Sequence, residues 1–260
     1  MPAHLHLPRR GLLSGTAALV GGALLGPVAG SPAAASAQAT PRLRTRADWK
    51  ARPPKVPATV LDRAPDHIVV HHTASANSTD YSPDHALALS RAIQDFHMDA
   101  NGWDDIGEQL TISRGGHLME GRNRTLEAVC TRRHVVGAHT LGQNDHTIGI
   151  ENEGTYMTAE PTAALWRRLV ATCAWLCDVY DLDPHAAIVG HRDYNGTSCP
   201  GDALYALLPR LRDQVAYRLF AYRLGGRGAA EASRARPSGL PGPRFTFDHG
   251  PALGPGDPTR

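Results

Sequence analysis

The sequence predicts an α/β fold, in which helices flank a central mixed β-sheet within a single domain. Short apolar runs alternate with helical patterns along the middle of the chain, and one hairpin pattern interrupts the alternation. The 42% of hydrophobic residues is enough for one core, whereas Pro and Gly gather near the two ends and in loops. One folded domain with two loose ends therefore fits the 260 residues.

The strands are expected where apolar residues form short runs. Such runs predict buried strands at residues 68–70, 147–151 and 187–189. Alternating apolar positions flank a turn at Arg114-Gly115-Gly116, which predicts a hairpin over residues 109–120. Strands that alternate with helices, together with one hairpin, indicate a mixed sheet.

The helices are expected where apolar residues recur at three- and four-residue steps. This periodicity predicts helices at residues 83–102, 162–180 and 202–222. The apolar stripe of the first helix consists of Ala86, Leu89, Ile93 and Phe96.

The four cysteines are too few for a disulfide scaffold. Cys173 and Cys177 are four residues apart on the stripe of the second helix, so core packing is their expected role. A disulfide from Cys130 to either of them is the alternative, because an exported protein could form one.

The beginning of the chain is typical of an export signal. Arg9 and Arg10 precede a stretch rich in Gly, Ala and Leu at residues 11–30, and Ala35-Ser36-Ala37 offers the small residues that signal peptidase accepts. The adjacent arginines resemble a twin-arginine signal. An uncleaved membrane anchor is the alternative, but so many Gly and Ala residues would retain it poorly in a bilayer.

The sequence thus divides into four segments. We expect a signal peptide at residues 1–37, an N-terminal extension of the mature chain at 38–65, the folded domain at 66–223 and a disordered tail at 224–260. The tail is rich in Pro, Gly and Arg and has almost no periodicity. The net charge of +2 does not suggest a nucleic-acid partner.

Three potential metal ligands follow apolar runs. They are His71, His191 and Cys199. A lone His or Cys is more often structural, but a His₂Cys set suits Zn²⁺ and leaves one coordination position for water. A structural zinc site would more often add a fourth Cys or His in short Cys pairs, which this sequence lacks. An open position indicates catalysis.

Four motifs in this order resemble type 2 N-acetylmuramoyl-L-alanine amidases and the peptidoglycan recognition proteins that share their domain. They are Arg46-Ala47-Asp48-Trp49, Val69-Val70-His71-His72-Thr73, Gly102-Trp103-Asp104-Asp105-Ile106-Gly107, and Gly190-His191-Arg192-Asp193 with Cys199-Pro200-Gly201. The resemblance covers about residues 44–212. It implies a zinc amidase domain with Zn²⁺ held in a surface groove by His71, His191 and Cys199.

The resemblance also implies the proton-transfer residues, although this chain departs from the common pattern. Many family members carry Tyr where this chain has Glu108 and Lys where it has Thr197. The segment Ile148-Gly149-Ile150-Glu151 is similar to the branch that uses a Glu of this strand as general base. We therefore expect Glu151 to move the proton, with Glu108 as the alternative, and Thr197 to hydrogen-bond the oxyanion.

Three further residues are expected at the substrate site. His139 lies on a loop that borders the groove in the resembled family, and Trp103 belongs to one of the shared motifs. His72 points to the opposite face of its strand from His71, because successive side chains alternate, so we expect it to pack behind or support the site.

The function implied is hydrolysis of the amide bond between N-acetylmuramic acid and L-alanine in peptidoglycan. The partner is then a glycan strand with its stem peptide, and the protein is secreted or associated with the cell wall, as a monomer without stable membrane insertion after cleavage. Two alternatives stay open: a peptidoglycan-binding module without catalysis, and a zinc peptidase that cuts the stem peptide. Cys199 argues against the first, because non-catalytic family members lack that cysteine.

Overall fold

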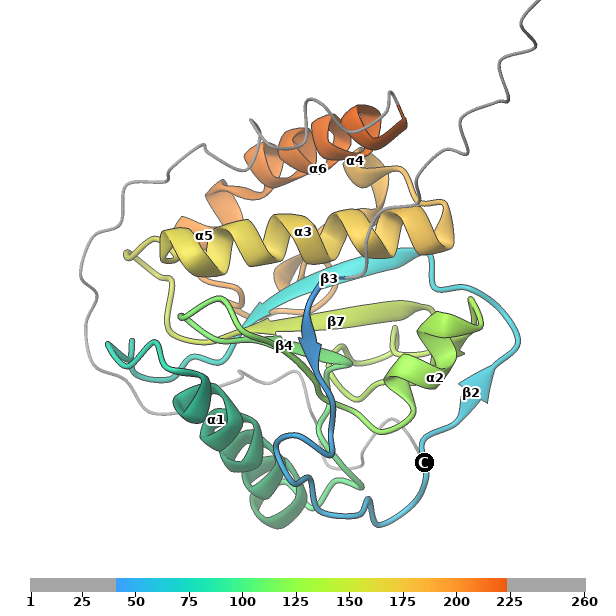
Figure 1. Cartoon of the computed structure of the whole chain (residues 1–260), viewed down its shortest axis with the longest axis vertical. Helices are drawn as coiled ribbons and strands as arrows, with labels where there is room; N and C mark the ends of the chain where they lie inside the picture. The colour runs from blue at the N-terminus through green and yellow to red at the C-terminus, as the bar shows by residue number, and fades with distance from the viewer. Residues whose placement is uncertain (1–40, 224–260) are drawn as a thin grey trace, which may run out of the picture. The chain divides into compact units, whose positions relative to one another are not determined.

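The computed structural model describes residues 41–223, which Figure 1 colours from blue to red. A six-stranded sheet has the strand order β1-β5-β4-β7-β3-β8. Its strands are β1 Leu43–Arg44, β5 Leu118–Glu120, β4 Leu110–Ile112, β7 Thr147–Asn152, β3 His67–His72 and β8 Ile188–Gly190. The strands β2 Val60–Leu61 and β6 His134–Val135 form a separate antiparallel pair. The expected signal peptide and the expected disordered tail lie outside the described residues.

The six-stranded sheet is mixed, as predicted. β3 pairs in parallel with β7 and with β8, and β4 pairs in parallel with β7 but antiparallel with β5. The carboxyl ends of β4, β7, β3 and β8 therefore lie at one edge of the sheet. The residues at and after these ends form the candidate site.

Helices cover both faces of this sheet (Figure 1). α3 Ala163–Tyr180 and α6 Leu208–Arg223 pack on one face, where apolar residues of both helices join Ile68, Val70 and Leu118 in the main core. α1 Pro83–Asp95 packs on the other face in a smaller cluster that contains Met119. Because side chains alternate along a strand, His71 points to the face opposite Val70.

The remaining helical segments are short. They are the π-helix η1 Phe96–Ala100, α2 Thr125–Cys130, α4 Pro184–Ala187, the 3-10 helix η2 His191–Asp193 and α5 Asp202–Ala206. None of the described helices has the length and the apolar character that crossing a bilayer requires.

The end of the first predicted helix differs from the expected pattern. α1 passes directly into η1, and the wider π turn shifts the buried face of the chain by one position. His97 and Met98 are buried at 0% and 3% exposure, whereas Phe96 is only partly buried. The prediction that the apolar stripe continues through Phe96 was therefore wrong.

The predicted helix at residues 202–222 is interrupted. α5 ends at Ala206, Leu207 forms a turn, and α6 begins at Leu208. Pro209 lacks the N–H that a continuous helix would direct to the carbonyl of Tyr205, so the helix breaks just before it. The preceding strand, β8, also starts one residue later than predicted, because Ala187 ends α4.

The two alternatives for the cysteines, core packing and a disulfide, have different outcomes in the structure. Cys173 and Cys177 are buried on α3, as expected for core residues. Both carry free thiols, as does the exposed Cys130, so the alternative disulfide is not formed.

Packing of α3 on the sheet gives a stability prediction. Leu169 is fully buried on this helix, and Leu169→Ala should lower the free energy of unfolding by about 2–5 kcal/mol because it leaves a cavity. Arg167→Ala, at an exposed position of the same helix, should change it by less than about 0.5 kcal/mol. Urea unfolding measures both, and equal losses for the two variants would contradict this packing.

Candidate metal centre

His71, His191 and Cys199 lie together at the carboxyl edge of the sheet. One potential ligand atom of each lies within 4.8 Å of the others, and the three residues are exposed by only 2%, 1% and 2%. His71 is in β3 and His191 directly follows β8, so the parallel pairing of these strands brings the two rings to a centroid distance of 4.5 Å. The loop that follows η2 carries Cys199 back to them.

Hydrogen bonds within this loop hold His191 and Cys199 in place. The N–H of Arg192 donates to the carbonyl of Cys199 at 3.0 Å, and the N–H of Cys199 donates to Oγ1 of Thr197 at 3.1 Å. At the start of the loop, the N–H of Gly190 donates to a carboxylate oxygen of Asp193 at 2.8 Å. Asp193 and Arg192 thus have supporting roles that the shared motif alone did not explain.

The tautomer of His191 is set by Asn195. Nε2 of His191 lies 3.1 Å from Oδ1 of Asn195, and the amide of Asn195 donates to the carbonyl of Leu141 at 3.4 Å. The amide oxygen therefore faces the ring, so Nε2 carries the proton and Nδ1 keeps its lone pair. Nδ1 is buried without a hydrogen-bond partner among the described residues. Burial lowers the pKa of His191 to about 4, so the ring is neutral at physiological pH.

His71 has the same tautomer, through His139. Nε2 of His139 lies 3.3 Å from the carbonyl of Thr147, which can only accept, so Nε2 is the protonated nitrogen of His139. Its Nδ1 then accepts from Nε2 of His71 at 3.0 Å. The remaining nitrogen of His71, Nδ1, faces Sγ of Cys199 at 3.7 Å. Burial also holds the pKa of His139 well below its ordinary value, which keeps its Nδ1 an acceptor.

His139 fits beside the sheet because β7 has a glycine there. A Cβ at Gly149 would lie 2.8 Å from the ring of His139, closer than real Cβ atoms come. The loop is fixed by Asn144, whose Oδ1 accepts from the N–H groups of His139 and Thr140 at 2.8 and 3.0 Å. Gly149 therefore has a packing reason that the strand pattern could not reveal.

The donor set fits a zinc ion. Two imidazoles and one thiol match the nitrogen and sulfur ligands that Zn²⁺ takes, and three protein ligands leave a position for water. Burial raises the pKa of the Cys199 thiol far above its ordinary value, so a bound cation is needed to stabilise the thiolate here.

A pair of buried carboxyl groups lies on the same face of the sheet. Glu151 is in β7, in register with His71 on one side and Thr111 on the other, and Glu108 precedes β4. Their exposed fractions are 0% and 3%. Burial raises the pKa of Glu108 to about 7, and burial together with the charge of Glu108 raises that of Glu151. The two expected proton-transfer residues are thus brought together.

His97 is a member of this group that the sequence did not indicate. One ring nitrogen of His97 and one carboxylate oxygen each of Glu108 and Glu151 lie within 4.8 Å of one another. Nδ1 of His97 accepts from the N–H of Gly107 at 3.1 Å, so Nε2 is protonated and suits a hydrogen bond to a carboxylate better than a metal. Its position four residues after Ile93 was the only signal, but the predicted stripe did not include it.

The three expected substrate contacts lie at or near this centre, and all are buried. His139 contacts His71 as described, and Trp103, which is 4% exposed, packs on the ring of His97 at a centroid distance of 4.5 Å. His72, at 2% exposure, accepts from the N–H of Tyr156 at 3.3 Å and is outside the His₂Cys group. Contact of these residues with substrate stays a prediction.

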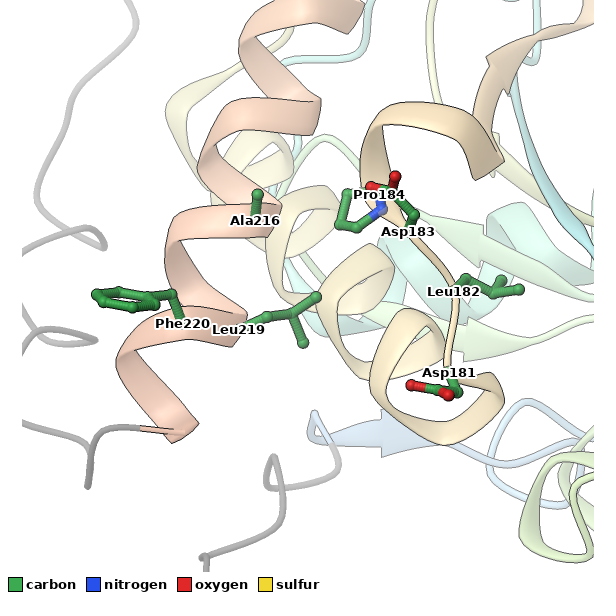
Figure 2. A pocket seen from close by; sticks show the side chains of 7 residues that line it. All are labelled: Asp181, Leu182, Asp183, Pro184, Ala216, Leu219 and Phe220. Atoms are coloured by element: carbon green, nitrogen blue, oxygen red, sulfur yellow. The ribbon is translucent and has the colours of Figure 1, made fainter.

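Figure 2 shows a cavity of about 370 Å³ that is separate from these residues. The segment Asp181–Pro184 lines one side of it, and Ala216, Leu219 and Phe220 of α6 line the other. Its lining contains neither imidazole nor thiol. The cavity therefore has no part in the candidate metal centre.

Known proteins with similar sequences include an amidase and a peptidoglycan-recognition protein. Human N-acetylmuramoyl-L-alanine amidase is 35% identical over 173 residues, which cover 65% of this chain and 28% of the human protein. Peptidoglycan-recognition protein LB of Drosophila melanogaster is 32% identical over 168 residues, covering 65% of this chain and 68% of that protein. The chain thus matches less than a third of the human protein's length.

Solved structures and a family model cover the same region. Drosophila PGRP-LB has a TM-score of 0.55 at 30% identity, covering 64% of this chain and 91% of that chain. Peptidoglycan recognition protein-LE in complex with tracheal cytotoxin has a TM-score of 0.57 at 27% identity, with coverage of 65% and 92%. A family model described as N-acetylmuramoyl-L-alanine amidase matches residues 61–202, more than half of the sequence and all three potential zinc ligands. The chain therefore belongs to the N-acetylmuramoyl-L-alanine amidase family.

Proposed function

We propose that this protein is a zinc-dependent amidase that hydrolyses the bond between N-acetylmuramic acid and L-alanine in peptidoglycan. The observation that carries the proposal is the group of His71, His191 and Cys199, in which one ligand atom of each lies within 4.8 Å of the others while hydrogen bonds engage Nε2 of both imidazoles. A protein that only binds a glycopeptide does not need such a set of metal ligands. A three-ligand site with an open position is typical of catalytic zinc.

The ligand residues are suited to bind the ion at neutral pH. The two imidazoles offer neutral nitrogen donors, and Cys199 offers sulfur once a cation stabilises its thiolate. When bound, Zn²⁺ lowers the pKa of its water to about 7 and polarises the scissile carbonyl.

Glu151 and Glu108 supply the proton transfers. Amide hydrolysis requires a group that takes a proton from the attacking water and gives one to the leaving amine. Two adjacent buried carboxyl groups share a proton, because ionising both places like charges side by side in a low dielectric. The pair thus holds an acceptor and a donor at once. Without a cation the shared proton resides on Glu151, whose pKa is raised by burial and further by the charge of Glu108. Glu151 is the proposed base because it lies beside His71 on the neighbouring strand, where a bound cation would favour its ionised form.

Thr197 is the proposed oxyanion donor. Its hydroxyl oxygen already accepts the N–H of Cys199, which fixes the side chain beside the metal ligand. The hydroxyl hydrogen is then the part of this group that can be donated to substrate. A neutral donor stabilises an oxyanion less than a cation does, so Thr197 contributes modestly.

A second candidate function is peptidoglycan binding without cleavage. The replacement of the usual Tyr and Lys by Glu108 and Thr197 favours it, and solved relatives include complexes with tracheal cytotoxin. Mass analysis of intact peptidoglycan treated with zinc-loaded protein decides the question. Release of stem peptides with a free L-alanine amino group supports the amidase; cleavage inside the stem indicates a peptidase, and no release indicates a binding module. The expected export signal places any of these activities at the wall.

Cys199→Ala should abolish both zinc retention and amide cleavage. Wild-type protein should carry about one zinc per chain by plasma mass spectrometry, whereas this variant should carry almost none because only two ligands remain. Cys177→Ala is the matched control, since it removes another buried thiol and should keep metal and activity. Cleavage by wild-type protein that persists after complete chelation would exclude zinc catalysis.

Glu151→Gln should reduce turnover by about 10²–10⁴-fold while zinc content stays normal, because the amide cannot take the proton of the water. Glu108→Gln should have a smaller effect, since a neutral amide still donates a hydrogen bond. Glu127→Gln, at an exposed site on α2, is the control. Release of stem peptides by Glu151→Gln within threefold of the wild-type rate, roughly, would remove Glu151 from the mechanism.

Loss of the hydrogen bonds behind the imidazoles should weaken zinc binding without removing a ligand. His139→Leu and Asn195→Leu should each lower zinc affinity by about 10–100-fold, measured by competition with a chelator. His139→Asn should restore part of the affinity, because its amide oxygen can occupy the position of Nδ1. Unchanged affinity in the half-buried Asn195→Leu variant, folded as judged by circular dichroism, would contradict this positioning role.

A further inference from the structure

A groove rich in arginine opens beside the turn that follows β4. Two cavities of about 290 and 420 Å³ share Gly115, Gly116 and Arg168 as lining residues and therefore adjoin one another. We call the combined feature the basic groove. Its basic residues are Arg42, Arg44, His117, Arg167, Arg168 and Arg218. No carboxylate lines either cavity.

The charges of the basic groove are not balanced from within the described part of the chain. Arginines elsewhere form ion pairs, such as Arg46 with Asp105 at 3.0 Å and Arg192 with Asp202 at 2.7 Å. Within residues 41–223, none of the five groove arginines has an acidic partner in an ion pair. Burial lowers the pKa of Arg168, and the nearby charges of Arg218 and Arg42 lower it further.

The groove has the form of an extended binding surface. Arg44 on β1 contributes to one end, Arg167 on α3 and Arg218 on α6 contribute to the other, and Arg168 lies in the shared middle. Gly115 and Gly116 let the turn pack closely against Tyr81 and Ala164, since a Cβ at either glycine would lie within 2.7 Å of a backbone carbonyl oxygen. Nε of Arg168 donates to the carbonyl of Gly116 at 2.8 Å, which fixes its guanidinium beside that turn. Charges arranged in this way suit a linear polyanion better than one small anion.

We propose that the basic groove binds a linear phosphodiester polymer, of the anionic kind that accompanies peptidoglycan in cell walls. Arginine is the residue best suited to phosphate, because its planar guanidinium donates two parallel hydrogen bonds. The groove lies at the carboxyl end of β4, the sheet edge at which the candidate metal centre also lies. Its helical lining comes mainly from α3 and α6, on the sheet face opposite His71. No groove residue belongs to that centre, so binding of the polymer does not depend on metal.

Charge reversal in the full-length, zinc-loaded protein tests this proposal. Arg42 and Arg167 are exposed and make no side-chain hydrogen bond to the rest of the described chain, so Arg42→Glu with Arg167→Glu should leave the fold intact. The matched control is Lys50→Glu with Arg132→Glu, which changes net charge equally at exposed positions outside the groove. Binding of a poly(glycerol phosphate) oligomer is measured by calorimetry at low and at physiological salt.

The groove variant should bind the oligomer at least about tenfold more weakly and with a shallower salt dependence, since fewer phosphates are neutralised. The affinity of the control variant for the oligomer should stay within about threefold of the wild-type affinity, because the control changes only the overall electrostatic field of the protein. Equal losses in both variants, or none in the groove variant, would overturn the proposal. So would equal binding of hyaluronate, a polycarboxylate, or full displacement of the oligomer by inorganic phosphate at the same phosphate concentration.

A second measurement separates this proposal from the amidase proposal. Turnover of a soluble muramyl peptide should be the same in wild type, control and groove variant, because the fragment does not reach the groove. Failure of the wild-type protein to cleave that fragment would contradict the amidase function alone. Loss of cleavage confined to the groove variant would instead place the groove in the reaction and overturn its separate role.

Discussion

The candidate site depends on the parallel register of β3 with its two neighbours. Pairing of His71 with Glu151 places a potential ligand beside a carboxyl group, and pairing of Val70 with Gly190 delivers His191 one residue later at the same edge. A slip of one residue would turn His71 towards α3 and leave the site without its first ligand. The apolar residues that alternate with His71 prevent this slip, because Ile68 and Val70 are fully buried against α3 and α6.

Hydrogen bonds behind the imidazoles convert this placement into a usable donor set. A chain runs from the carbonyl of Thr147 through His139 to His71, and Asn195 plays the same part for His191. In both His71 and His191 the proton is on Nε2 and the lone pair is on Nδ1. Neither ring therefore has to change tautomer when its Nδ1 binds a cation. A cation that binds this donor set in the folded chain and not in the unfolded chain would stabilise the fold, so metal binding and folding stability would be linked.

Much of the framework was predictable because it is local. Apolar runs located β3, β7 and β8, and the motifs around His71, His191 and Cys199 located three potential ligands that the fold brings together. Contacts between distant loops were not predictable. The acceptor role of His139 depends on the carbonyl of Thr147 and on the absence of a side chain at Gly149, and the role of His97 depends on a π turn that shifted the helical stripe. Periodicity placed Phe96 and not His97 on the buried stripe, so it could not show that His97 faces the carboxyl pair.

The basic groove and the candidate metal centre lie at one edge of the sheet but on opposite faces, which would have a physical consequence for the proposed amidase and its insoluble substrate. A polymer held by several arginines raises the local concentration of the wall around the metal centre, which helps when the reacting bond is sparse in a network. Because the attraction is electrostatic, it weakens steeply with salt, and the individual contacts between arginine and phosphate can break one at a time. Such an anchor can hold the protein on the wall while leaving it free to move between bonds, whereas one tight contact would fix it at a single place.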